Sequence, residues 1–224
     1  MSRGVAASSG FAPAPHTLAA LKRDALNYVQ GTQDDSDLNA LAQRAINNAI
    51  DRINSRTWMK VVNKWTITLV ADDADYGLPS DYKEPIILLR LTSGSKRDGR
   101  LKYKELKTLL TEHPISTQSG TPWFYSTQYQ QRQLLLDKPP AASFITTYPT
   151  LEHWYHRRIP HLTADADKID IQPEFERFIV SHAAATLAAM RGHQVLSFVR
   201  QEEELAWMEL KADDNETQTD WSEQ

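Results

Sequence analysis

The residues with the clearest capacity for chemistry are three histidines in the run His153-Trp154-Tyr155-His156-Arg157-Arg158-Ile159-Pro160-His161, because three imidazoles could hold a metal ion. If this run is a strand, however, His153 and His156 are three positions apart and point to opposite faces. The neighbouring Arg157 and Arg158 would also repel a cation. We therefore interpret the run as a polar strand end with surface histidines, and we expect neither a metal ion nor a cofactor.

Two acidic clusters could in principle bind a cation or supply catalytic carboxylates. Asp72-Asp73-Ala74-Asp75 is similar to a fragment of a calcium loop, but it lacks the central Gly and the Glu at position twelve that an EF-hand needs. We interpret it as an acidic turn between strands. Helix capping before Pro173 is the expected role of the second cluster, Asp165, Asp167 and Asp170. Paired carboxylates for glycoside hydrolysis stay an alternative, although the sequence points to no particular pair.

The chain contains none of the common catalytic or phosphate-binding motifs, GxGxxG, GxxxxGK[ST], HExxH or GxSxG. It has no cysteine, which excludes disulfides, thiol nucleophiles and thiolate metal sites. We expect a chain that is not an enzyme, and an enzyme with an unmarked site is the alternative. The basic run from Lys96 to Lys104 favours a charged hairpin loop that meets solvent or an acidic partner, with a nucleic-acid groove as its alternative.

Length and composition suit one globular domain, or one domain with an insertion, because the 224 residues are 41% hydrophobic and 24% charged. No stretch reaches the roughly 18 consecutive apolar residues of a membrane span, so no membrane contact is expected. The net charge of −4 is uneven, because residues 202–224 hold nine acids and one base. We expect residues 1–16 to be a flexible arm without a signal peptide, and residues 212–224 to be a disordered acidic tail.

Apolar residues at spacings of three and four predict helices at both ends of the chain. The first helix covers 17–29 and ends at Gly31, and the second covers 37–56 and is capped by Ser36 or Asp37. A further helix begins at Pro173, which fits a first helical position, and it bends or breaks at Gly192. The helical pattern resumes over 195–211.

Between the helices, short β-branched and aromatic runs alternate with Gly, Pro and Asp-Gly turn signals. They predict strands at 62–70, 85–92, 100–103, 123–128, 133–137 and 144–156, with a short helix at 104–110. The expected fold class is therefore α+β. Residues 17–57 and 157–211 form a bundle from the N- and C-terminal helices, and residues 58–156 are a small antiparallel β domain inserted into it.

The alanine-rich helix after Pro173 is the main candidate for contacts between subunits. It is apolar more than halfway round, which is more than one partner within the chain requires. We therefore assign an intersubunit interface to Ala184, Ala185, Ala188 and Phe198. Burial of this helix at the centre of its own monomer is the alternative. For the aromatic stretch 123–129, a core position is the favoured interpretation and an exposed interface is the alternative. Because Trp and Tyr are enriched at interfaces, the candidate docking residues are Trp123, Tyr125 and Trp207.

An ordered set of motifs runs through residues 37–192. The first alanine-rich helix ends in Arg52-Ile53-Asn54, and Leu78-Pro79-Ser80-Asp81-Tyr82 later forms an LP-x-DY turn. Gly120-Thr121-Pro122 opens a strand, and the run Leu134-Leu135-Leu136-Asp137-Lys138-Pro139-Pro140 closes one. Ile171-Gln172-Pro173-Glu174-Phe175 then opens the second alanine-rich helix. In this order the motifs resemble the head–tail adaptor (connector, or head-completion) proteins of tailed bacteriophages, although adjacent prolines replace the P-x-P that is frequent in that family.

The resemblance implies a structural virion protein without catalytic residues. It implies a homo-oligomeric ring, typically of twelve copies, in the virion neck between the capsid vertex and the tail, built from chains made in the host cytoplasm. Its partners would be other copies of itself, the portal protein and a downstream tail or nozzle protein. Genomic DNA would pass through the lumen without specific binding. Another tail-completion or nozzle-type neck protein is the alternative with the same layout.

Overall fold

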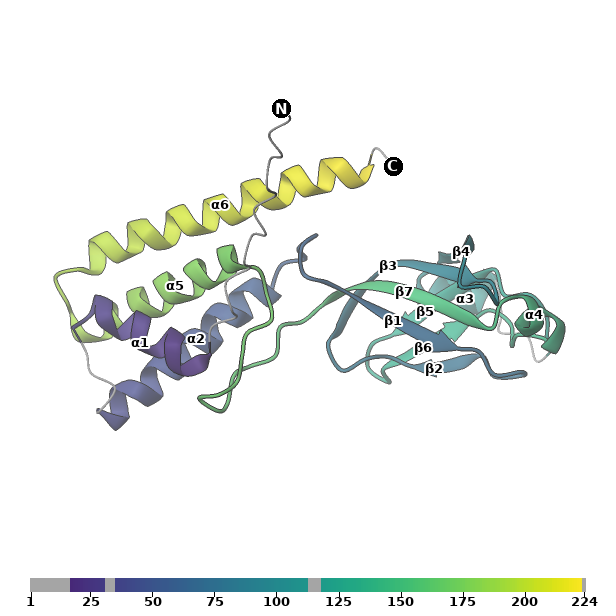
Figure 1. Ribbon diagram of the computed structural model, residues 1–224, viewed down its shortest axis with the longest axis horizontal. Coiled ribbons are helices and arrows are strands. Elements are labelled where there is room, and N and C mark those ends of the chain that lie inside the picture. The colour runs from purple at the N-terminus through teal and green to yellow at the C-terminus, as the bar shows by residue number, and fades with distance from the viewer. Residues whose placement is uncertain (1–16, 31–34, 113–117, 223–224) are drawn as a thin grey trace, which may run out of the picture. The chain divides into compact units, whose positions relative to one another are not determined.

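The computed structural model describes residues 17–30, 35–112 and 118–222, so the expected flexible arm, 1–16, lies outside the described residues. The chain divides into two compact units (Figure 1). The β unit is the continuous segment Thr57–Arg158, and the helical unit combines residues 1–56 with residues 159–224. Within the described residues there are six helices and seven strands, which confirms the predicted α+β class with helices on both sides of the sheet in sequence.

The two N-terminal helices, α1 (Leu18–Tyr28) and α2 (Ser36–Asn54), begin at side-chain caps. The Thr17 hydroxyl accepts a hydrogen bond from the backbone N–H of Ala20. The Asp35 carboxylate accepts from the N–H groups of Asp37 and Leu38, which have no partner inside the helix. The sequence-based cap of α2, Ser36 or Asp37, is therefore wrong, because the side chain one residue earlier reaches both donors.

The C-terminal helices are α5 (Pro173–Arg191) and α6 (Leu196–Ser222). Gly192 ends α5 with a φ of 61°, a left-handed conformation in which glycine meets no steric cost. α6 differs from expectation, because residues 212–222 are helical where charge predicts a disordered tail. Its buried face continues at a spacing of four through Ala206, Leu210 and Asp214, and no Gly or Pro interrupts it. Packing thus extends the helix at least as far as Asp214 despite its charge.

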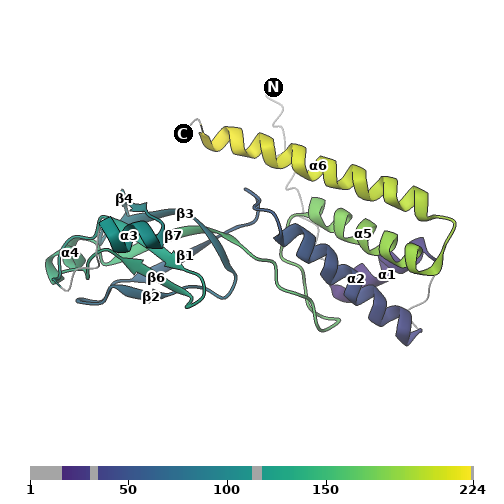
Figure 2. The same ribbon diagram turned by 180° about the vertical axis from the view of Figure 1, so that it is seen from behind.

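α5 lies in the middle of the helical unit, between α6 on one side and α1 with α2 on the other, in both views (Figures 1 and 2). The largest fully buried side chains are aliphatic in α1 and α2 and aromatic in α5. They are Leu18, Leu21, Leu26, Ile46, Ile50, Ile53, Phe175 and Phe178. Full burial of one such side chain stabilises a fold by about 1.5–3 kcal/mol, so this core holds the two ends of the chain together.

Two asparagines of α2 fix the segment that follows the β unit. The Asn54 side chain donates to the Ile159 carbonyl and accepts from the Ile159 N–H, both at 2.9 Å. Asn47 makes the same pair of bonds with Leu162, at 3.1 and 3.0 Å. Each amide therefore satisfies one donor and one acceptor of an irregular backbone, as a neighbouring strand would.

One seven-stranded sheet forms the β unit, in the order β1-β7-β3-β4-β5-β6-β2. The strands are β1 (Val62–Thr68), β2 (Asp75–Gly77), β3 (Tyr82–Leu91), β4 (Arg97–Tyr103), β5 (Phe124–Gln128), β6 (Gln133–Leu136) and β7 (Thr150–Arg157). Neighbours are antiparallel except β4 and β5, which are parallel, so the predicted antiparallel sheet needs this one correction. The connection between β4 and β5 includes the helix α3 (Leu106–Glu112), and a parallel pair requires such a crossover.

The last predicted strand, 144–156, is correct only in its second half. Residues Ala142–Thr147 form the helix α4, in which the Tyr148 N–H bonds to the Phe144 carbonyl. The β-branched run in this segment favours a strand by propensity, but Phe144 is buried in the β core while most of its neighbours in α4 are exposed. A helix this short, with one buried residue, has no repeat of apolar residues from which it could be predicted. The strand β2, of three residues, is likewise too short to predict.

Candidate functional site

The three histidines that could hold a metal ion do not come together. His153 and His156 lie on β7 with the spacing that sends them to opposite faces, and both are buried rather than on the surface as expected. His156 places Nδ1 3.0 Å from the Trp58 carbonyl oxygen, and His161 places Nε2 2.7 Å from Asp51 in the helical unit. In the described parts of the chain, no group of three or more His, Asp or Glu side chains is arranged to hold a metal ion.

His153 is enclosed by aromatic rings in the core of the β unit. Its ring centroid lies 5.7 Å from that of Tyr82, 5.6 Å from that of Tyr125 and 6.0 Å from that of Tyr155. Neither of its nitrogens has a hydrogen-bond partner among the described residues, and burial lowers its pKa to about 4. The imidazole is thus neutral and closed to solvent, so we assign it a packing role.

The carboxylates of the two acidic clusters hold loops in place. Asp73 accepts a hydrogen bond from the Asp75 N–H at 3.0 Å, which is the acidic turn that the sequence predicts. Asp167 accepts from the N–H groups of Ala164 and Thr163, and these bonds lower its pKa. The expectation that this second cluster caps the next helix is wrong, because Gln172 occupies the cap of α5 and makes no side-chain cap bond.

The predicted intersubunit residues of α5 lie inside the helical unit's own core. Ala184 and Ala188 are fully buried, Ala185 is 5% exposed, and Ala184 and Ala185 pack with Val199 of α6. Small side chains here let α5 approach its neighbours closely. Burial favours the alternative of a central helix, and contact of these alanines with another subunit stays a prediction. Phe198, the fourth member of the set, is 56% exposed.

Trp207, a predicted docking residue, takes part in a cluster that joins three helices. Its ring lies 4.7 Å from that of Phe178 on α5, and the Arg52 guanidinium carbon of α2 lies 4.9 Å from its centroid. Arg52 also bonds to Glu203 of α6, which accepts a further bond from His182 Nδ1 at 2.8 Å if that nitrogen is protonated. Trp207 is only partly buried, so its docking role stays a prediction beside this structural one.

The two other docking candidates have opposite environments. Tyr125 is 1% exposed and lies in the β core, which places it among the packing residues. Trp123 is 55% exposed, and the Arg90 guanidinium lies 5.7 Å from its ring and 5.1 Å from that of Tyr148. Arg90 is anchored by a 3.0 Å bond to the Asp98 carbonyl. An exposed group of Trp, Tyr and Arg has the composition of a binding hot spot, and docking by Trp123 remains a prediction.

A second apolar surface lies on the outer face of α6, and the sequence-based prediction named only one of its residues, Phe198. We define this outer face as Phe198, Leu205 and Met208, which are 56%, 46% and 57% exposed. Their spacings of seven and three place them on one side of the helix, opposite the buried residues Val199, Ala206 and Leu210. α6 is therefore apolar on two sides and packs on α5 with only one. The sequence contains this apolar spacing, but the many acidic residues between these positions weaken the helical periodicity that would indicate it.

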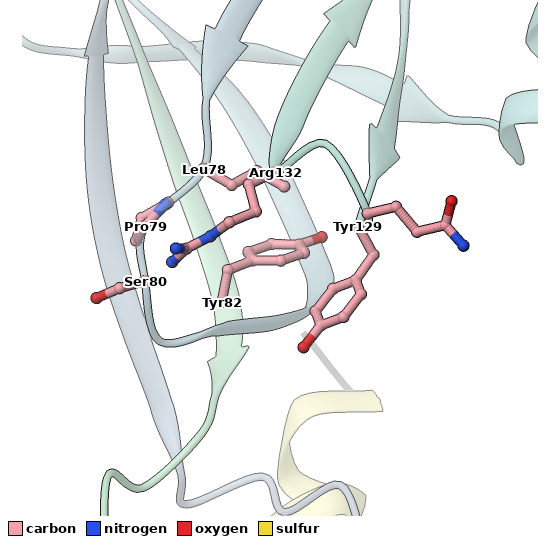
Figure 3. A pocket seen from close by; sticks show the side chains of 7 residues that line it. Leu78, Pro79, Ser80, Tyr82, Tyr129 and Arg132 are labelled. Atoms are coloured by element: carbon pink, nitrogen blue, oxygen red, sulfur yellow. The ribbon is translucent and has the colours of Figure 1, made fainter.

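The β unit also contains a pocket of about 450 Å³ (Figure 3). It lies between the loop before β3 and the β5–β6 turn, and its lining residues are Leu78, Pro79, Ser80, Tyr82, Tyr129, Gln130 and Arg132. Pairing of β2 with β6 brings the two segments together. The pocket combines apolar and aromatic walls with one cation, as ligand sites commonly do. No local sequence pattern reveals the pocket, because its two halves are about 50 residues apart in the chain.

Comparison with known proteins agrees with the resemblance that the ordered motifs of residues 37–192 indicate. No curated protein matches the chain. The model of the SU10 adaptor protein family matches residues 16–221, which cover both units and nearly the whole described chain. None of the helices in the described part of the chain is long and apolar enough to cross a membrane. A match of this extent shows that the chain belongs to the SU10 adaptor protein family, a family of phage head–tail adaptors.

Proposed function

We propose that the chain is a structural, non-catalytic head–tail adaptor, which forms a ring in the virion neck, docks on the portal and connects the phage head to the tail. The family match over residues 16–221 carries this proposal. The ring is expected to hold twelve copies around the DNA channel and to offer its other side to a downstream tail or nozzle protein. Genomic DNA passes through it without specific binding.

The outer face of α6 supports a lateral contact between copies. Three large apolar side chains there, Phe198, Leu205 and Met208, are about half exposed on a helix whose other side is already buried. Closed rings are built from heterologous contacts, in which one face of each subunit meets a different face of the next. An exposed apolar stripe that extends over about ten residues of one helix is suited to such a contact.

The acidic character of α6 supports passage of DNA without binding. Between Leu196 and Asn215 the helix carries six acids against two bases. Carboxylates repel phosphates, so an acidic wall would not retain the duplex. A DNA-binding protein would instead show an affinity that falls steeply with added salt.

The experiment is the mass of the full chain in solution, measured by light scattering, for the wild type and for the triple variant Phe198→Ser, Leu205→Ser and Met208→Ser. We expect the wild type to form a closed oligomer, alone or on its portal, and the triple variant to remain monomeric with its helix content unchanged. The matched control is Val70→Ser, an apolar residue that is 56% exposed in the β unit and should leave assembly intact. Assembly of the triple variant with wild-type mass would reject α6 as the lateral contact.

A further inference from the structure

The pocket of the β unit is bordered by two arginines whose charges are not neutralised. Among the described residues, neither Arg132 nor Arg158 forms an ion pair or a side-chain hydrogen bond. The Arg158 guanidinium instead lies 5.1 Å from the ring of Tyr129, which lines the pocket. Asp81 is already engaged, because it accepts hydrogen bonds from the Tyr155 hydroxyl at 2.8 Å and from Asn63 at 3.2 Å. Both guanidinium groups are therefore available to an external carboxylate.

The walls of the pocket suit an aromatic side chain. The Tyr82 ring lies between Tyr129 and Pro79, and the Arg132 side chain extends above this ring toward Pro79 (Figure 3). A volume of about 450 Å³ is enough for an indole. Tyr82 is 4% exposed and belongs to the β core, so core packing holds this part of the pocket lining in place. An apolar cavity beside unpaired guanidinium groups fits an acidic peptide segment with one aromatic residue.

The chain itself contains such a segment. Asp220-Trp221-Ser222-Glu223 places one indole between two carboxylates, inside a region of nine acids and one base from 202 to 224. The first three of these residues form the last turn of α6, which extends beyond the N-terminal end of α5 (Figure 1). The helical unit carries eleven Lys and Arg against nineteen Asp and Glu, a net −8, whereas the β unit carries fourteen against ten, a net +4. Charge therefore attracts this segment toward a β unit.

We infer that the pocket of the β unit binds the C-terminal segment of a second copy of the chain, with Trp221 in the cavity and Asp220 and Glu223 on Arg132 and Arg158. The choice of a second copy rests on the proposed ring. The contact links subunits through a short acidic, aromatic segment, separately from the outer face of α6. It gives the acidic end of the chain a role in assembly.

The test uses a labelled peptide of residues 212–224 and full-length Trp221→Ala as the receptor, because this variant cannot fill its own pocket with an indole. Fluorescence anisotropy at low salt should show saturable binding, which weakens as salt screens the charges. Arg132→Gln in the receptor should weaken binding at least tenfold. Arg100→Gln, an exposed arginine elsewhere in the β unit, should change it less than twofold. The peptide with Trp221→Ala should bind at least tenfold more weakly than the wild-type peptide.

Three results would overturn the inference: no binding, equal binding by Arg132→Gln, or equal binding of the peptide without its indole. Circular dichroism of each receptor verifies folding, and Tyr129→Ser supplies a second variant on an exposed pocket residue. The mass of the wild-type chain is measured in parallel, alone and mixed with its cognate portal. Assembly without peptide binding refutes the pocket contact and leaves the adaptor ring standing, whereas peptide binding without assembly refutes the ring and retains the pocket.

Discussion

The helical unit and the β unit have cores of different composition. The core of the helical unit is aliphatic and aromatic, with small alanines on its central helix, and its polar contacts lie at the edges between helices. The core of the β unit contains the tyrosines Tyr82, Tyr125 and Tyr155 together with buried polar atoms of His153 and Ser126 that have no described partner. The stability of the first unit should therefore depend mainly on packing, with a smaller share from polar contacts between helices, and that of the second should depend strongly on pH.

The difference extends to the surface. The helical unit is acidic, with a net −8, and exposes an apolar stripe on α6, whereas the β unit is basic, with a net +4, and exposes Arg and aromatic groups. Apolar stripes suit permanent packing between subunits, and Arg with Trp or Tyr suits recognition of a defined partner. One chain thus carries two surfaces of different composition, which fits the proposal that it joins unlike neighbours.

The largest expected effect concerns the packing of the helical unit. Ala184→Arg inserts a long cation into a fully buried position between α5 and α6, and should destabilise the helical unit by more than about 4 kcal/mol. Ala189→Arg, an exposed position on the same helix, is the control and should be nearly neutral. Circular dichroism during urea unfolding would measure both. A folded Ala184→Arg monomer with normal stability would contradict the burial of this alanine.

The pH dependence of the β unit is the next effect. The pKa of His153 is about 4 in the folded chain and 6.5 for an ordinary histidine, so the unfolded chain binds the proton more tightly. Stability is complete above pH 6.5 and falls as the pH decreases toward 4, by about 3 kcal/mol from this residue alone. Urea midpoints between pH 7 and 4 would measure the slope.

His153→Leu should remove this residue's share of the slope, because the replacement cannot bind a proton. His161→Gln, which alters an exposed histidine of the helical unit, should leave the slope unchanged. If wild type and His153→Leu lose stability equally on acidification, the buried neutral imidazole is not the cause.

A smaller effect is expected at the Arg52 cluster. Arg52→Met removes the cation from the rings of Phe178 and Trp207 and leaves Glu203 without its guanidinium partner. Because Arg52 is partly exposed, the loss should be only about 1 kcal/mol in the free energy of unfolding. Arg44→Met, an exposed arginine on the same helix, is the matched control. Equal stability of the two variants would show that the cluster does not contribute.

The long helices could be predicted because their buried residues repeat at spacings of three and four, and because Pro173 and Gly192 mark their ends. The short elements could not, since the three residues of β2 and the single turn of α4 have no repeat to detect. Pairing of β4 with β5 in parallel depends on contacts between segments, which local patterns do not contain.

The candidate sites could likewise not be predicted fully, because they depend on contacts between segments that are distant in the sequence. The alanines around Ala184 are apolar on several sides, but the sequence alone does not say whether a neighbouring helix of the same chain or another subunit covers each side. The pocket near Tyr82 depends on two loops that meet through the β2–β6 pair. The acidic end of α6 was assigned to disorder on charge, whereas the spacing of Leu210 and Asp214 continues its buried face.

The most direct test of the central claim is the mass of the complex that forms when the full chain is mixed with its cognate portal, measured by light scattering after size-exclusion chromatography. An adaptor predicts one defined complex in which the chain and the portal subunit occur in a fixed ratio near one to one. A chain that elutes separately from the portal, at a mass unchanged by the mixture, would contradict the adaptor function.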